Sequence, residues 1–212
     1  RRHRPNELPC RLRNARVTGT VVDRARMFRR VLVLLGVFFV LVQVNRSGGA
    51  VLATYLADSS GMSPADIGAV MGAMFLASAL IQLPTGILFD WLGPRQTLTC
   101  MSAVAVAGVA AFAMSGDALG MMVGRFAIGL GHGGVITGVY LVAMAWAPEG
   151  RSAQATASVV GIAGGIGGVL ATMPLAFALE RFGLSASFLA LTAGTAAVTL
   201  MRSNGACSGQ PR

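Results

Sequence analysis

The stretch Gly86-Ile-Leu-Phe-Asp90-Trp-Leu-Gly93-Pro94-Arg95 decides the fold, because it is a short charged turn between two long apolar runs. These runs cover about 67–89 and 97–115. Each is close to the roughly 20 apolar residues that a helix needs to cross a bilayer. Gly93-Pro94 is a strong turn signal, since Pro fixes φ and Gly adopts conformations that other residues avoid. The stretch therefore predicts two membrane-spanning helices joined as a hairpin.

The composition favours a membrane protein over a soluble one. Of the 212 residues, 54% are hydrophobic and 12% are charged, whereas a soluble domain carries about 25% charged residues. The remaining apolar residues gather in further runs of membrane-spanning length, so we expect an all-α protein in the lipid bilayer. Its six predicted transmembrane helices cover about 31–57, 67–89, 97–115, 118–146, 152–179 and 185–201.

Residues 1–30 form an Arg-rich segment, and 202–212 form a polar tail. The net charge is +9, and most of the arginines precede Val31. A basic flank beside the first apolar run is typical of the cytoplasmic side of a membrane protein. The alternative, an arm that binds nucleic acid, is disfavoured, and we expect no nucleic-acid partner. The sequence begins without Met, and Met27, just before the first apolar run, is the natural translation start.

The charges of the loops predict the orientation. One set of loops is basic and lies on the same side as the Arg-rich start, and the other set is mainly acidic. Positive charge marks the inside, so we expect both termini in the cytoplasm and the protein in the plasma (inner) membrane. The basic set contains Arg95, Arg151 and Arg202, and the opposite set contains Asp58, Asp66, Asp117, Glu180 and Arg181.

Three motifs resemble those of the major facilitator superfamily. The turn at 86–95 resembles the family's signature loop, and the matching positions are Gly86, Asp90, Gly93 and Arg95. In the predicted fourth helix, Gly124-Arg125-Phe-x-x-Gly129-x-Gly131 is similar to the family's second motif. Pro148-Glu-x-Arg151 resembles its next cytoplasmic loop. The resemblance covers about 30–201 and implies one half, the N-terminal one, of a 6+6 helix bundle.

The resemblance implies secondary active transport of a small solute by alternating access. The partners that it implies are a small-molecule substrate, a proton or other coupling ion, and either a missing C-terminal half or a second copy. The chain departs from the family at Trp91 and Pro94, where the family often has Arg. The predicted fifth helix lacks the Gly-Pro pair of the antiporter motif, which disfavours half of a proton-coupled drug efflux pump. Its glycines, spaced by four, predict close helix packing; they are Gly161, Gly164, Gly165 and Gly168.

Arg46 is a candidate for binding substrate. It lies about 15 residues after Val31, or roughly 22 Å along a helix. An arginine at that depth costs about 2.5–3.5 kcal/mol, so it should face a wet cavity or a partner. Together with Gln43 one turn earlier, it would capture an anionic solute. The alternatives are a buried structural pair or an Arg that reaches the outer interface.

Arg125 and His132 are candidates for coupling. They are seven residues apart, which places them on one face of a helix with Gly129 between them. An imidazole titrates near neutral pH, so His132 would couple proton movement to transport. The alternative for His132 is a hydrogen bond to a neighbouring helix. For Arg125, the alternatives are a role in coupling or gating and a purely structural role.

The resemblance implies that Asp90 and Arg95 latch the two halves together in the outward-open state. The alternative is a turn that only sets topology. No phosphate-binding loop occurs, and the three cysteines, Cys10, Cys100 and Cys207, have no metal-ligand spacing. We therefore expect no enzyme activity, cofactor or metal. A truncated or non-transporting six-helix membrane protein remains the alternative function.

Overall fold

A computed structural model describes residues 10–147 and 150–205, and over these ranges its regular structure is entirely helical. Six helical stretches of the described chain are long and apolar enough to cross a membrane. The predicted all-α class with six membrane-length helices is confirmed. The elements are α1 (Cys10–Ser47), α2 (Gly49–Ser59), α3 (Pro64–Met114), α4 (Ala118–His132), α5 (Val135–Trp146), α6 (Ser152–Ser158), the π-helical turn η1 (Val159–Ala163), α7 (Gly164–Leu170) and α8 (Met173–Gly205).

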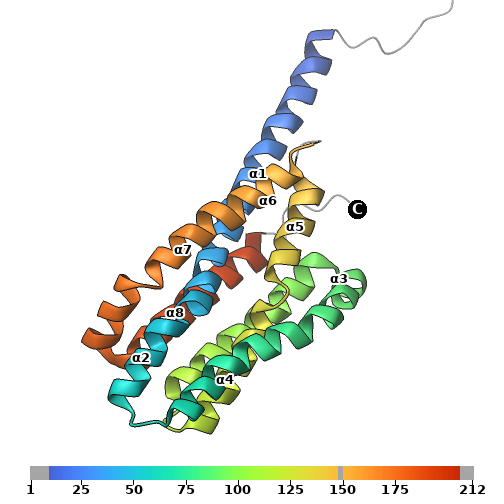
Figure 1. Cartoon of the computed structure of the whole chain (residues 1–212). Coiled ribbons are helices and arrows are strands. Elements are labelled where there is room, and N and C mark those ends of the chain that lie inside the picture. The colour runs from blue at the N-terminus through green and yellow to red at the C-terminus, as the bar shows by residue number, and fades with distance from the viewer. Residues whose placement is uncertain (1–9, 148–149, 206–212) are drawn as a thin grey trace, which may run out of the picture.

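The predicted hairpin lies in the middle of α3. Gly93 has φ 76° and ψ 163°, a region open almost only to glycine. The Thr97 hydroxyl donates a hydrogen bond to the Leu88 carbonyl over 2.8 Å. Residues nine apart in a continuous helix are about 13 Å apart along its axis, so this bond requires the chain to reverse. The first limb of α3 (64–92) and its second limb (94–114) are therefore two crossings, as Figure 1 shows.

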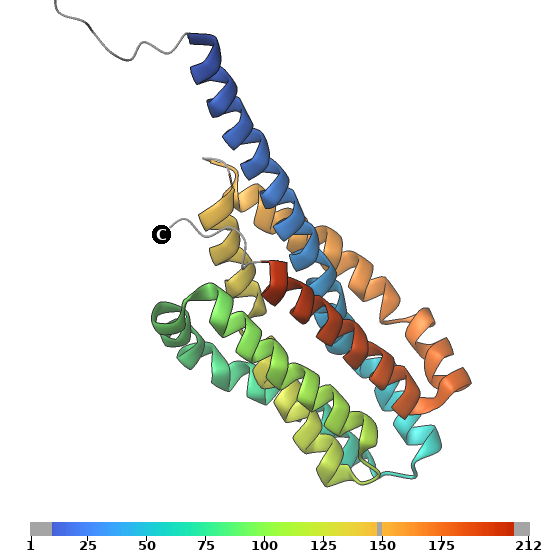
Figure 2. The ribbon, with the colours of Figure 1, turned by 180° about the vertical axis from the view of Figure 1, so that it is seen from behind.

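A second hairpin lies in α8. Gly183 has φ 78° and ψ 173°, and the Ser187 hydroxyl donates to the Ala178 carbonyl over 3.0 Å. The same geometric reasoning makes 173–182 the first limb and 184–205 the second limb of α8. The first limb continues the crossing that α6, η1 and α7 begin, and the second limb is the sixth crossing (Figure 2).

Three predicted helices are interrupted in the structure. Gly48 separates α1 from α2, and Gly133-Gly134 separates α4 from α5, because glycine is a poor helix former. A turn at 171–172 separates α7 from α8. It precedes Pro174, which has no N–H to donate to the carbonyl four residues earlier. The sequence did not predict the interruptions at the glycines.

The two ends of the chain differ from the sequence expectation. The helix α1 already begins at Cys10, whereas the sequence predicted a tail up to residue 30 and a helix from 31. Residues such as Arg, Leu, Met and Ala are good helix formers, so a membrane helix extends readily into this segment. Figure 2 shows this part of α1, in dark blue, projecting beyond the bundle. At the other end, α8 continues to Gly205, beyond the predicted end at 201.

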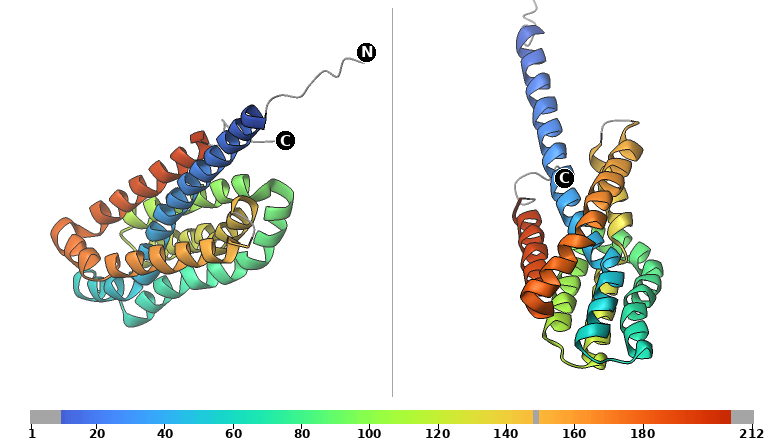
Figure 3. Two further views of the ribbon diagram at one scale, coloured as in Figure 1. Left: turned by 90° about the horizontal axis from the view of Figure 1, so that it is seen from above. Right: turned by 60° about the vertical axis from the view of Figure 1, so that its left-hand side comes forward.

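The helix α4 packs tightly against both limbs of α3. A Cβ atom added at Gly124 would collide with Phe112 of the second limb, and one at Gly129 would collide with Met74 of the first limb. Because these positions lack side chains, the backbones approach closely, as small residues allow in membrane bundles. The view from above in Figure 3 shows α5, the yellow half of the fourth crossing, among α1, α3 and α6. The two polar side chains of α4 that are buried in this way are Arg125 and His132.

Candidate functional site

Arg125 lies in the interior of the bundle, and 1% of its surface is exposed. Its Nη1 donates to the Asn45 carbonyl oxygen in α1 over 3.2 Å and lies 3.5 Å from Sδ of Met74 in α3. Its guanidinium carbon is 4.9 Å from the ring centre of Phe112 and 6.0 Å from that of Phe188. Arg125 therefore connects α4 to α1, to both limbs of α3 and to α8.

The local sequence explains this position. Asp117 begins α4 as an N-cap that accepts from the Gly120 amide, and Arg125 follows about two turns later. Gly124 beside it allows α4 to approach Phe112. Sequence reasoning did not identify Asn45 or the two phenylalanines as partners of Arg125. A polar Asn in an apolar helix was a signal for Asn45, whereas buried and lipid-facing phenylalanines look alike in a sequence.

His132 is the last residue of α4 and is 2% exposed. It lies within electrostatic reach of both Arg46 and Arg125. The structure thus brings three of the four predicted binding and coupling residues into one region. Because α4 ends here and α5 begins at Val135, His132 lies at a break in the fourth crossing.

Three buried polar atoms in this region have no hydrogen-bond partner within the described part of the chain. They are Asn45 Oδ1, Arg125 Nε and His132 Nδ1. A buried polar group left unpaired costs about 1–3 kcal/mol. Native proteins satisfy most such groups, so three unpaired groups in one region call for an explanation, such as a functional role or a bound water.

Arg46 and Gln43 lie near the end of α1, and both are half-buried. The Gln43 amide donates to the Ser47 hydroxyl over 2.8 Å, which places the two on one face of α1. No ion pair in the described part of the chain neutralises Arg46. The carboxylates whose side chains the structure describes are all exposed, and they are Asp58, Asp66, Asp90, Asp117 and Glu180.

The signature turn is remote from this region. Asp90 is exposed at the α3 hairpin, and Gly86 has open space where a Cβ would lie. The side chain of Arg95 and the residues Pro148 and Glu149 are outside the described part of the chain. In Figure 1 the hairpin is at the same end of the bundle as the turn between α5 and α6.

The glycines of the fifth crossing face two directions. Gly164 lies against Phe39 of α1, and a Cβ atom added at Gly164 would be 3.3 Å from the ring. Gly167, which was not among the predicted packing residues, is closer still, because its Cβ would lie 2.6 Å from Gln43 Cβ. At the other three predicted packing glycines, a Cβ atom would have no neighbouring atom within 4 Å. These glycines are Gly161, Gly165 and Gly168.

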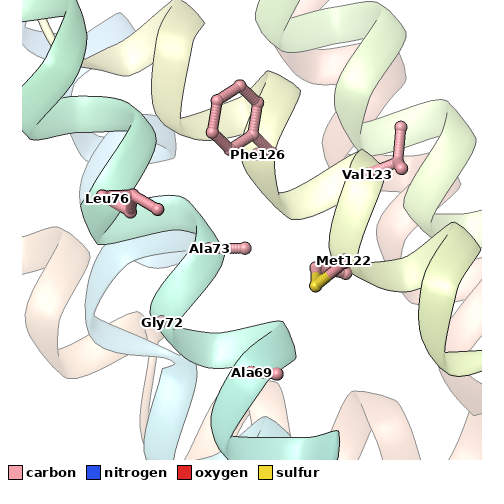
Figure 4. A pocket seen from close by; sticks show the side chains of 7 residues that line it. All are labelled: Ala69, Gly72, Ala73, Leu76, Met122, Val123 and Phe126. Atoms are coloured by element: carbon pink, nitrogen blue, oxygen red, sulfur yellow. The ribbon is translucent and has the colours of Figure 1, made fainter.

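A groove of about 550 Å³ runs between the first limb of α3 and α4 (Figure 4). No polar side chain lines it, so it is suited to lipid or an apolar helix and not to a charged solute. None of the candidate residues lies in it. Its lining consists of Ala69, Gly72, Ala73, Leu76, Met122, Val123 and Phe126.

Two solved transporters have a similar fold. The POT family transporter PepTSo, in its in meso crystal structure, superposes with a TM-score of 0.70 at 19% identity, covering 86% of this chain and 39% of that chain. An auto-inhibited POT family peptide transporter has a TM-score of 0.68 at 20% identity, with 86% and 38% covered. This chain thus spans about two fifths of the length of these structures. A search of curated proteins finds no match.

The family itself is established by sequence. The family model of the Major Facilitator Superfamily matches residues 33–203, which is most of the chain. The match includes the signature turn and the α4 motif around Arg125, and it agrees with the fold of the two transporters. It confirms the resemblance found in the motifs. This chain therefore belongs to the Major Facilitator Superfamily of integral membrane transport proteins.

Proposed function

We propose that this chain is the N-terminal half of a permease that moves a small anionic solute by alternating access. The family match and the likeness to two fifths of a transporter support a half-permease. The observation that carries the anionic solute is the charge balance of the interior. Among the residues whose side chains the structure describes, Arg125 is buried and Arg46 is half-buried, whereas every carboxylate is exposed.

The two arginines have different parts in this proposal. Arg125 is enclosed by aromatic rings and by the Asn45 carbonyl, so it is a positioning residue that holds α4 against α1. Arg46 is half-buried and lacks an ion-pair partner in the described chain. A guanidinium presents a planar set of donors that matches a carboxylate or phosphate. Arg46 therefore contacts the solute, and Gln43 supplies a further polar group beside it.

His132 is the proton site of the same proposal. It is buried close to both arginines and its Nδ1 is unpaired within the described chain. Imidazole is a common proton carrier in proteins, so we assign to His132 the proton that would accompany the solute. The break between α4 and α5 beside it gives the fourth crossing a place to bend as access alternates.

The signature turn is the latch of the proposal. Asp90 is exposed at the end of the α3 hairpin, where a C-terminal half, or a second copy of this chain, would meet it in the outward-open state. The basic loops favour a plasma (inner) membrane protein with this turn and both termini in the cytoplasm.

Uptake into proteoliposomes tests the proposed function. The protein, with its second half, is assayed with matched panels of anionic and neutral solutes. Anionic solutes should be taken up preferentially, and Arg46→Gln should reduce that uptake at least tenfold, while Arg46→Lys retains part of it because the charge remains. Arg30→Gln is the matched control, since Arg30 is an exposed arginine of the same helix.

Two results would count against the proposal. Undiminished anion uptake by Arg46→Gln would remove Arg46 from the binding site. No uptake of any solute, with correctly folded protein in the membrane, would favour the alternative of a non-transporting six-helix protein.

A further inference from the structure

The hairpin turn at Gly183 repeats the hairpin turn at Gly93, 90 positions later in the chain. Both glycines have nearly the same backbone angles, φ 76° and ψ 163° against φ 78° and ψ 173°. In both turns a hydroxyl four residues after the glycine donates to the carbonyl five residues before it. A carboxylate stands three residues before each glycine, Asp90 in one turn and Glu180 in the other.

The pattern of burial repeats as well. Asp90 and Glu180 are both exposed, and the residues that precede them, Phe89 and Leu179, are both buried. The equivalence continues beyond the turn and before it. Further matching pairs are Pro84 with Pro174, both exposed, Thr97 with Ser187, both buried, and Leu98 with Phe188, both buried. The two acids therefore project from equivalent positions of two equivalent turns.

The two turns lie at opposite ends of the bundle. The Gly93 turn follows the second crossing and the Gly183 turn follows the fifth, so an odd number of crossings separates them. Figure 1 shows the second turn, in orange, at the end away from the α3 hairpin. If the Gly93 turn is cytoplasmic, the Gly183 turn faces the outside.

Glu180 borders an open cleft of about 290 Å³ between α2 and the first limb of α8. Asp58 of α2 lines the same cleft, together with the hydroxyl-bearing residues Thr54, Tyr55 and Ser59. No ion pair within the described part of the chain occupies either carboxylate. Two carboxylates on one rim favour a cationic partner and disfavour an apolar one.

We propose that Glu180 is a second latch, which binds a basic side chain of the second half at the outer end when that end is closed. The inference rests on the proposed function, because a latch requires a second half that moves. The chain spans about two fifths of the matched transporters, so the region that would carry this basic residue is outside it. The contact of Asp90 would hold the outward-open state at one end, and the contact of Glu180 would hold the inward-open state at the other. Each contact would form as the other breaks.

Cysteine accessibility in the complete transporter tests this proposal. Ser47→Cys is the reporter, because Ser47 is small and exposed beside Arg46, and Cys10, Cys100 and Cys207 are replaced by Ser. A membrane-impermeant maleimide is applied from either side of membrane vesicles. Glu180→Gln should raise the ratio of outside to inside labelling at least threefold, and Asp90→Asn should lower it by a similar factor. Glu180→Asp should stay near the parent, and Arg181→Gln is the control for a lost charge on the same exposed turn.

The outcomes separate the two proposals. If Asp90→Asn changes the ratio of outside to inside labelling and Glu180→Gln does not, the second latch is overturned and alternating access stands. A labelling ratio that Arg181→Gln changes as much as Glu180→Gln also overturns it, because any charge on the turn would then suffice. A reporter that reacts from neither side in the parent and in both acid variants contradicts alternating access itself.

Discussion

At the scale of single residues, Arg125 is a cation held inside a membrane bundle, and none of the described carboxylates pairs with it. Its hydrogen bond to the Asn45 carbonyl contributes about 1.5–3 kcal/mol as a bond to a charged group. The ring of Phe112 at 4.9 Å adds up to about 2 kcal/mol as a cation–π contact. Burying a charge costs several kcal/mol, so these contacts do little more than offset the cost. Stability alone gives no reason for an arginine here.

Arg125→Met tests whether Arg125 serves function. The variant keeps an apolar chain of similar length and removes the buried charge, so the free energy of unfolding should stay within about 1 kcal/mol of the parent or rise. Uptake should fall at least tenfold, because α4 loses its polar contact with α1. Thermal unfolding in detergent and proteoliposome uptake are measured together. A variant that loses stability yet transports normally per folded molecule would assign Arg125 a structural role.

His132→Ala tests proton coupling. Uptake by the parent should change with pH, because the proposal assigns the coupled proton to His132, and the variant should lose that dependence. The sequence has one other histidine, His3, and His3→Ala is the matched control. An unchanged pH profile in His132→Ala would remove the proton from the mechanism.

Sequence reasoning identified the ionisable residues of the site and missed their apolar partners. Arg46, Arg125 and His132 were conspicuous because charged and titratable groups are rare in apolar runs. Phe112 and Phe188 could not be distinguished from lipid-facing residues, because lipid and core are equally apolar. Only the three-dimensional arrangement places them against the guanidinium.

At the scale of elements, glycine allows two different features, close helix contact and chain reversal. In the fifth crossing, Gly164 and Gly167 lie against α1, whereas the other face is open. The spacing in sequence predicted close packing for the whole set, but spacing does not say which face meets a neighbour. Similarly, the apolar runs predicted the crossings, whereas the breaks at Gly48 and Gly133 depend on packing between helices.

Gly167→Ala and Gly165→Ala are a matched pair for this contact. The added methyl at Gly167 would lie 2.7 Å from the Val40 carbonyl oxygen and requires α7 to move away from α1, which should cost about 1–3 kcal/mol. At Gly165 the methyl has free space, and stability should stay the same or rise by up to about 1 kcal/mol. Thermal unfolding in detergent measures both. Equal effects of the two substitutions would contradict the described packing.

The two hairpin turns should respond alike to substitution. Gly93→Ala and Gly183→Ala each force a side chain into a backbone region open almost only to glycine, at a cost of about 1–3 kcal/mol. Loss of the cross-turn hydrogen bond in Thr97→Val or Ser187→Ala should cost about 1 kcal/mol. Chemical unfolding in mixed micelles measures all four. If only the Gly93 turn is sensitive, the equivalence of the two turns is wrong.

At the scale of the whole molecule, the described part of the chain is one bundle with six membrane-length helices, and its family is established. The fold was predictable from the lengths of the apolar runs and the motif order, because a bilayer leaves few architectures for such a chain. The solute was not, since it depends on a few side chains and on a cavity shared with a second half. Arg46, half-buried and without an ion-pair partner in the described chain, is the residue that connects fold to function.

Solute protection of the Ser47→Cys reporter tests the central claim most directly. The reporter stands next to Arg46 on α1, and the rate of its reaction with an impermeant maleimide is measured from each side of the membrane. We expect reaction from both sides and a slowing of at least fivefold by a transported anion, with no slowing by a neutral analogue or in Arg46→Gln. Reaction from one side only, or rates that no anion changes, would contradict an alternating-access site for an anionic solute at Arg46.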